Sequence, residues 1–190
     1  MMQDSNDTRG VNALEFLKHK HDEVDEMFSR FEEIKDNGDD AQKEDLVAQI
    51  CEALTIHAQI EETIFYPAAR RALQEQGQEL LDEAAVEHQT LKDIVGRLEM
   101  APTSDPLYDA GVKVLSEYTK HHVREEENEL FPKVRQTNLD LDALGRQLAE
   151  RQQELEAQDQ RTSQNGRARR GSQGRGARGT TSESRSRSTH

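Results

Sequence analysis

The stretch that decides the fold is His57-Ala-Gln-Ile-Glu61-Glu62-Thr-Ile-Phe65-Tyr66-Pro67, and it returns 65 positions later as His122-Val-Arg-Glu-Glu126-Glu127-Asn-Glu-Leu130-Phe131-Pro132. Each copy places a histidine and a glutamate four residues apart, about one helical turn, so both side chains leave the helix on the same side. Two such turns that face each other offer two imidazoles and two carboxylates. Sets of this kind commonly hold two metal ions inside a helix bundle.

Helical periodicity continues on both sides of these two stretches. Turn-forming residues at 37–40, 77 and 101–106 separate four long helical runs, predicted at about 11–36, 41–76, 78–100 and 106–136. Four long helices joined by short connections favour an all-α, up-down-up-down four-helix bundle over residues 11–136. We expect a short fifth helix over 137–160, lying across the bundle or mediating self-association. Residues 1–10 are expected to be disordered.

Each of the four long helices carries one histidine on its apolar stripe. In the first helix, for example, His21 fills the gap in the apolar spacing between Leu17 and Val24. Burying several titratable groups without partners costs several kcal/mol, and a bound cation removes that cost because each lone pair becomes a ligand. The sequence therefore predicts a metal centre in the middle of the bundle. Its ligands are His21, His57, Glu61, His88, His122 and Glu126.

Two neighbouring pairs of histidines require a choice. His21, and not His19, completes the apolar spacing of the first helix, so we expect His19 on the solvated face. His121 stands four residues before Glu125, the same spacing as in the His122 turn, and helical periodicity does not separate the two. The repeat does, because only the carboxylate at 126 keeps the six-residue distance to the next proline that the first copy shows.

The chemistry of these ligands restricts the metal. Imidazole and carboxylate ligands without thiolate suit iron, manganese or zinc. Six protein ligands exceed the four of one tetrahedral zinc site. Two ions bridged by both carboxylates, each holding two imidazoles, use all six and leave positions for water, hydroxide, oxo or a diatomic ligand. Two iron ions are the leading assignment. The single cysteine, Cys51, excludes a Cys-based site and is expected to be an inert core residue.

The spacing of these histidines and glutamates, together with Glu127-x-x-Leu-Phe-Pro, resembles the hemerythrin-like (HHE cation-binding) domains over about residues 11–136. The resemblance implies a non-heme di-iron centre, oxo- or hydroxo-bridged, in which Glu61 and Glu126 bridge the irons. It further implies that His21 and His57 sit on one iron and His88 and His122 on the other. The family implies binding of O₂, reaction with peroxide or nitric oxide, or sensing of iron and oxygen.

Two positions depart from the oxygen-carrying members of that family. The carriers have a second histidine one turn before His88, where this chain has Ala84, and an aspartate where it has Glu126. One iron therefore lacks a protein imidazole, and an open position favours direct reaction with O₂ or peroxide over reversible carriage. The alternatives for filling it are water or a side chain, among them Glu87, Glu125 and Tyr118.

Charge divides the chain in two. Residues 161–190 contain eight arginines and one glutamate, a net charge of +7, so residues 1–160 carry −20 of the total of −13. An acidic body repels nucleic acid and anionic membranes, so any contact with nucleic acid is expected through this basic tail. The tail is rich in Arg, Gly and Ser and is expected to be disordered. We expect no membrane span and a cytoplasmic setting.

The expected function is binding of, or reaction with, O₂, peroxide or nitric oxide at a di-iron centre. Two other classes remain open. One is a sensor of iron, oxygen or redox state that acts through a partner or the basic tail. The other is metal storage or a purely structural metal bundle. The sequence assigns no specific enzymatic reaction and no oligomeric state.

Overall fold

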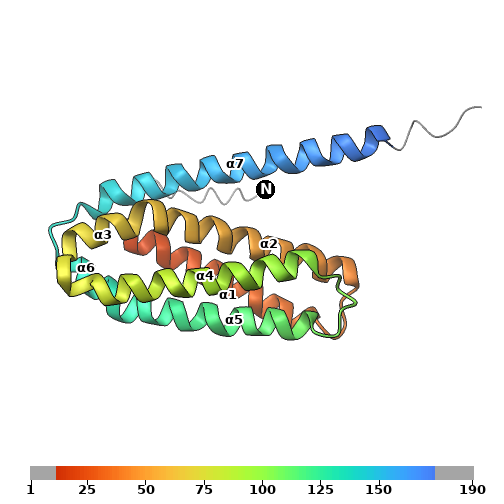
Figure 1. The fold of residues 1–190 in the computed structure, drawn as a ribbon, viewed down its shortest axis with the longest axis horizontal. Helices are drawn as coiled ribbons and strands as arrows, with labels where there is room; N and C mark the ends of the chain where they lie inside the picture. Colours follow the sequence, from red (N-terminus) through yellow and green to blue (C-terminus); the bar gives the residue numbers. More distant parts are fainter. Residues whose placement is uncertain (1–11, 174–190) are drawn as a thin grey trace, which may run out of the picture. The chain divides into compact units, whose positions relative to one another are not determined.

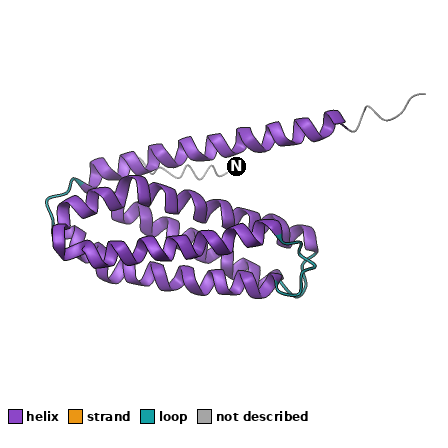
Figure 2. Cartoon of the chain, in the orientation of Figure 1, coloured by secondary structure: helices purple, strands orange, loops and turns teal. Residues whose placement is uncertain are grey.

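The computed structural model describes residues 12–173, and all secondary structure in this range is helical (Figures 1 and 2). The four long helices are α1 (Ala13–Ile34), α2 (Asp40–Ile60), α4 (Gln78–Met100) and α5 (Tyr108–Glu125). The shorter segments and the last helix are η1 (Glu61–Phe65), α3 (Tyr66–Leu73), η2 (Gln74–Gly77), η3 (Glu126–Leu130), α6 (Phe131–Arg135) and α7 (Leu141–Gln173). Helix α1 contacts α2, α2 contacts α4, α4 contacts α5, and α5 returns to α1. The predicted all-α four-helix bundle is confirmed.

Side-chain caps fix where the first two helices begin. The Asn12 carboxamide accepts a hydrogen bond from the backbone N–H of Leu14 (3.1 Å), and Asp39 caps α2 in the same way. Such caps satisfy amide groups that have no partner within the helix. The turn before Asp39 needs glycine, because a Cβ at Gly38 would lie 2.7 Å from the carbonyl oxygen of Ile34.

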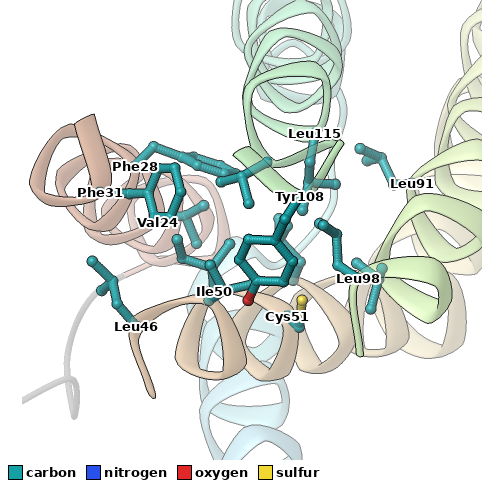
Figure 3. Close-up of a cluster of buried hydrophobic side chains, with 14 residues drawn as sticks. Val24, Phe28, Phe31, Leu46, Ile50, Cys51, Leu91, Leu98, Tyr108 and Leu115 are labelled. Carbon is teal, nitrogen blue, oxygen red and sulfur yellow. The ribbon is translucent and has the colours of Figure 1, made fainter. Parts of the chain in front are cut away.

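A cluster of apolar side chains fills one half of the bundle, next to the α1–α2 and α4–α5 turns (Figure 3). Its members are Val24, Phe28, Phe31, Leu46, Val47, Ile50, Cys51, Leu54, Leu91, Val95, Leu98, Tyr108, Val112 and Leu115. Each large side chain buried here stabilises the fold by roughly 1.5–3 kcal/mol. Cys51 lies inside the cluster, as expected, and burial raises the pKa of its thiol to about 12. On each of the four helices the stripe histidine lies just beyond this cluster.

A π-helical turn interrupts the helix in both copies of the repeat. In η1 the backbone N–H of Tyr66 donates to the carbonyl of Glu61, five residues back, and in η3 Phe131 donates to Glu126. A proline follows each turn. Proline lacks an N–H and its ring clashes with the carbonyl four residues earlier, so a regular α-helix does not pass through it undisturbed. The π turn before each proline takes up this disturbance, and the helix continues beyond it as α3 and α6.

Helix α7 differs from the predicted fifth helix. The prediction ended this helix at 160 and began a disordered tail at 161, whereas α7 continues to Gln173. The chain divides after Gln153 into two compact units, and α7 contributes to both. In the first unit, Leu144 and Leu148 of α7 are buried. The predictions for residues 1–10 and for 174–190 lie outside the described residues. None of the described helices is long and apolar enough to cross a membrane.

Candidate metal centre

The structure brings all six predicted ligands together. The four stripe histidines come from α1, α2, α4 and α5, and all are buried. The Nε2 atoms of His21 and His57 lie 3.0 Å apart, and those of His88 and His122 lie 3.1 Å apart. The imidazoles therefore form two pairs, each with its Nε2 atoms turned toward the interior of the bundle.

The carboxylate of Glu61 lies between the two pairs. Its Oε1 is 3.1 Å from the Nε2 of His57, and its Oε2 is 3.4 Å from the Nε2 of His88. The Oε2 of Glu126 lies 3.3 Å from the Nε2 of His21. The first ligand group is His21, His57, Glu61 and Glu126, and the second is Glu61, His88 and His122. Glu61 is therefore shared between them, while Glu126 falls with the first group.

Both carboxylates are buried without hydrogen-bond partners. Among the described residues none of the four oxygens of Glu61 and Glu126 has a hydrogen-bond partner, although imidazole nitrogens lie 3.1 Å from Glu61 and 3.3 Å from Glu126. Burial raises the pKa of Glu61, but the imidazoles of His57 and His88 outweigh it and hold that pKa well below its usual value. The Glu61 carboxylate therefore carries its charge in the interior, where an uncompensated charge costs several kcal/mol.

The metal-free protein offsets part of this charge with a proton. Burial lowers the pKa of His21, but the carboxylates of Glu126 and Glu127 outweigh that effect and raise it to about 10. Burial lowers the pKa of His57, which stays neutral. Burial also lowers the pKa of His88, but the carboxylates of Glu61 and Glu126 outweigh that effect and raise it. A divalent cation can take the place of such protons, because buried carboxylates and imidazoles that face one another are metal ligands.

Three glutamate carboxylates outside the centre orient three of the four histidines. Each outer carboxylate accepts a hydrogen bond from an imidazole Nδ1–H, at 2.8–3.0 Å, and contacts a basic side chain on its outer side. Holding Nδ1 in this way directs the Nε2 lone pair inward, as metal-binding histidines require. The three chains run Lys18–Glu127–His21, Lys92–Glu62–His88 and His121–Glu87–His122.

A residue that the helical spacing does not point to lies beside His88. The hydroxyl of Tyr66 lies 3.2 Å from the Nε2 of His88, and the residue is only 5% exposed. Glu87 binds the outer nitrogen of His122 instead, and Tyr118 is exposed. Burial and the neighbouring carboxylates raise the pKa of the Tyr66 phenol well above its usual value.

The repeat carries a signal for this tyrosine. Phe131 occupies the equivalent position in the second copy, and its ring stacks on His21 at 6.1 Å between centroids. Both aromatic rings thus face the centre, but only Tyr66 brings an oxygen. That oxygen lies beside the ligand group that has one fewer carboxylate, so the two groups end with four donor atoms each.

A small cavity opens beside the second ligand group. It measures about 20 Å³, room for roughly one molecule the size of water. Its walls are three of the histidines and mostly apolar side chains of α2, α4 and α5, among them Leu54, Leu91 and Val95. A small, weakly polar ligand fits such a space better than a bulky one.

The histidines rejected on grounds of spacing lie outside the centre. His19 is 47% exposed at its side chain and pairs with Glu23, and His121 is 53% exposed and contacts Glu87 and Glu125. The register of the repeat therefore selected the histidine that lies in the centre, His122, over the one that lies at the surface, His121.

Known proteins resemble this chain over the same region. The model of the family described as "Hemerythrin HHE cation binding domain" matches residues 12–134. A crystal structure of a hemerythrin HHE cation-binding domain-containing protein from Mycobacterium kansasii superposes with a TM-score of 0.66 at 26% identity, covering 78% of this chain and 89% of that one. A curated protein from Nostoc sp. named DNA nickase is 28% identical over 130 residues, which are 68% of this chain. The match spans 35% of that relative's length.

Proposed function

This chain belongs to the family of hemerythrin HHE cation-binding domains, and on that basis we propose that it holds two iron ions and binds or reacts with O₂, peroxide or nitric oxide. One observation carries the proposal: Glu61 turns one oxygen toward each of two imidazole pairs. A carboxylate placed in this way suits a bridge between two ions. The donor set fits the group, because four buried carboxylate oxygens have no hydrogen-bond partner among the described residues.

Each of the two ions has its own set of proposed ligands. The first ligand group would hold one ion through His21 and His57, and the second group would hold the other through His88 and His122. We assign the Tyr66 oxygen to the second ion, since it lies 3.2 Å from the Nε2 of His88. Histidine, carboxylate and phenolate donors together suit iron better than the softer transition metals.

An iron pair supplies open coordination positions and electron transfer to a small ligand. The chain's own part is to orient the imidazoles, to exclude bulk water and to admit the ligand. The outer carboxylates of Glu62, Glu87 and Glu127 orient the rings, and changing such partners typically costs 10–100-fold in metal affinity or activity. The cavity beside His57, His88 and His122 gives a diatomic molecule or a peroxide space next to the centre.

The response of the iron-loaded protein to small ligands tests this proposal. We expect the optical spectrum to change on addition of azide, nitric oxide or hydrogen peroxide, in the full chain loaded with iron. A spectrum that stays unchanged after each of the three additions contradicts the proposal and favours storage or a structural metal bundle. A change in partner binding or oligomeric state with redox state, without turnover of peroxide, favours a sensor.

The relative named DNA nickase favours a second candidate, action on DNA. Residues 161–190 carry a net charge of +7, which attracts phosphate backbones, whereas residues 1–160 carry −20. Conversion of supercoiled plasmid to the nicked form, measured with and without added metal, tests this candidate. A plasmid that stays supercoiled under all metal conditions excludes nicking by this chain.

A further inference from the structure

The outer partner of one of the three carboxylates differs from the other two. Glu127 and Glu62 each contact a lysine, at 2.9 and 2.6 Å, and a protonated lysine does not bind metal. Glu87 contacts His121 instead, with 3.2 Å between its Oε1 and the Nε2 of the imidazole. An imidazole is a metal ligand, so the outer end of this chain differs in chemistry from the other two.

A second carboxylate completes a three-ligand group at this position. Glu125, one turn after His121 on α5, lies 3.3 Å from the same Nε2. Ligand atoms of Glu87, His121 and Glu125 lie within 4.8 Å of one another. The group is accessible, because the side chains of His121 and Glu125 are 53% and 29% exposed. One imidazole and two carboxylates suit Fe²⁺, Mn²⁺ or Zn²⁺.

The surface group is joined to the inner centre. The Oε2 of Glu87 lies 2.8 Å from the Nδ1 of His122, while its Oε1 faces His121. A second small cavity, about 10 Å³, is lined by Glu87 and Glu125 on its outer side and by His122 and Glu126 of the centre. Two carboxylates of the surface group and two ligands of the centre thus line the same cavity.

We propose that Glu87, His121 and Glu125 form a surface site for a divalent transition-metal cation, which receives Fe²⁺ and passes it to the inner centre. The passage to the centre rests on the proposed function; binding at the surface does not. The alternative is that His121 only contacts the two carboxylates as neighbouring surface side chains do, and this alternative predicts no bound cation. The competing readings therefore differ in a measurable way.

The chain contains a matched control. His19 pairs with Glu23 on α1 at the same four-residue spacing, with 3.2 Å between the Nε2 and a carboxylate oxygen. His19 belongs to none of the three-ligand groups found among the described residues. His19→Ala removes an exposed imidazole of similar surroundings and leaves the proposed surface site intact.

Two measurements on the full chain test the proposal. In the first, Zn²⁺ is titrated into iron-loaded protein. We expect one additional Zn²⁺ per chain in the unsubstituted protein and in His19→Ala, and its loss in His121→Ala and in Glu125→Gln. The absence of additional Zn²⁺ in the unsubstituted protein, or its persistence in both surface variants, overturns the surface site.

In the second measurement, metal-free protein is mixed with Fe²⁺ without oxygen, and iron that resists a chelator is counted over time. Because a surface site that concentrates Fe²⁺ next to the centre can raise its rate of arrival by tenfold or more, we expect the loss of this site in His121→Ala to slow loading roughly tenfold. The final iron content stays unchanged. Equal loading rates overturn delivery, and a lower final content does too, since it would place His121 in the centre. If the unsubstituted protein retains no iron, the proposed function fails instead, while the Zn²⁺ titration of the iron-free chain still tests the surface site.

Discussion

Replacing Tyr66 with phenylalanine removes a single oxygen from the centre. The ring keeps its packing, so no cavity forms, and the metal-free protein loses only the hydrogen bond to His88. Such a bond contributes about 0.5–1.5 kcal/mol. For a chain of this size we expect the midpoint of thermal unfolding to fall by only about 2–4 °C per kcal/mol.

The metal-loaded protein is expected to respond more strongly. In the proposed centre the Tyr66 oxygen would be one of four donors at the second ion, and loss of a supporting partner alone typically costs 10–100-fold in affinity. We therefore expect the second ion to bind at least about tenfold more weakly in Tyr66→Phe, equivalent to about 1.4 kcal/mol. The first ion, held by His21, His57, Glu61 and Glu126, keeps its affinity.

Equilibrium dialysis against buffered Fe²⁺ without oxygen measures both affinities, and the optical spectrum of the oxidised protein gives a second readout. A phenolate bound to Fe³⁺ absorbs visible light, and that absorption should vanish in Tyr66→Phe. Tyr118→Phe is the matched control, because it removes a phenol oxygen from an exposed side chain. Two ions bound to Tyr66→Phe as tightly as to the unsubstituted protein would refute the assignment of this oxygen.

The remaining predictions concern orientation, ligand identity and pH. Glu127→Gln weakens the hydrogen bond that orients His21, so we expect metal affinity to fall about 10–100-fold; calorimetric titration measures it, and an unchanged affinity contradicts the role. His57→Ala should lose at least one ion per chain and with it the stabilisation that a bound metal gives, while His19→Ala keeps both; metal analysis and thermal unfolding decide between them. The raised pKa of His21, about 10, means that the metal must displace a proton, so affinity should rise with pH by up to about tenfold per unit between about pH 6.5 and 10. In the metal-free fold the same proton stabilises fully below the unfolded pKa of about 6.5, and that contribution is lost as pH rises through the folded value.

The six predicted ligands could be placed from the sequence because they obey α-helical periodicity. On each helix the histidine occupies one position of an apolar stripe, and burial of that stripe brings the four together. Residue spacing also located Glu61 and Glu126, which lie one turn after His57 and His122. The bundle follows from the same periodicity, since the short turns force neighbouring helices to be antiparallel.

Helical periodicity did not identify Tyr66 as a residue of the centre, and the reason is geometric. A regular α-helix turns about 100° per residue, so five residues place Tyr66 about 140° around the axis from Glu61. The π turn of η1 closes with a hydrogen bond between these two residues and returns Tyr66 to the side of Glu61. Helical periodicity does not predict which turn of a helix contains an extra residue. The exchange of Tyr66 for Phe131 between the two copies was the available signal.

The length of α7 also escaped prediction. Gly166, Gly171 and the serines after 160 lower helix propensity, and the segment has few apolar residues to bury, so composition favoured a disordered segment there. The helix nevertheless continues to Gln173. We have no physical explanation for this continuation from the described side chains.

We propose that this bundle binds two iron ions between its four buried histidines, Glu61 and Glu126. Iron content per chain, measured together with the optical spectrum of protein loaded with Fe²⁺ and exposed to air, tests it most directly. We predict two irons per chain and the near-ultraviolet charge-transfer bands of a di-iron centre. One metal ion per chain, or a colourless protein that prefers zinc, would contradict the claim.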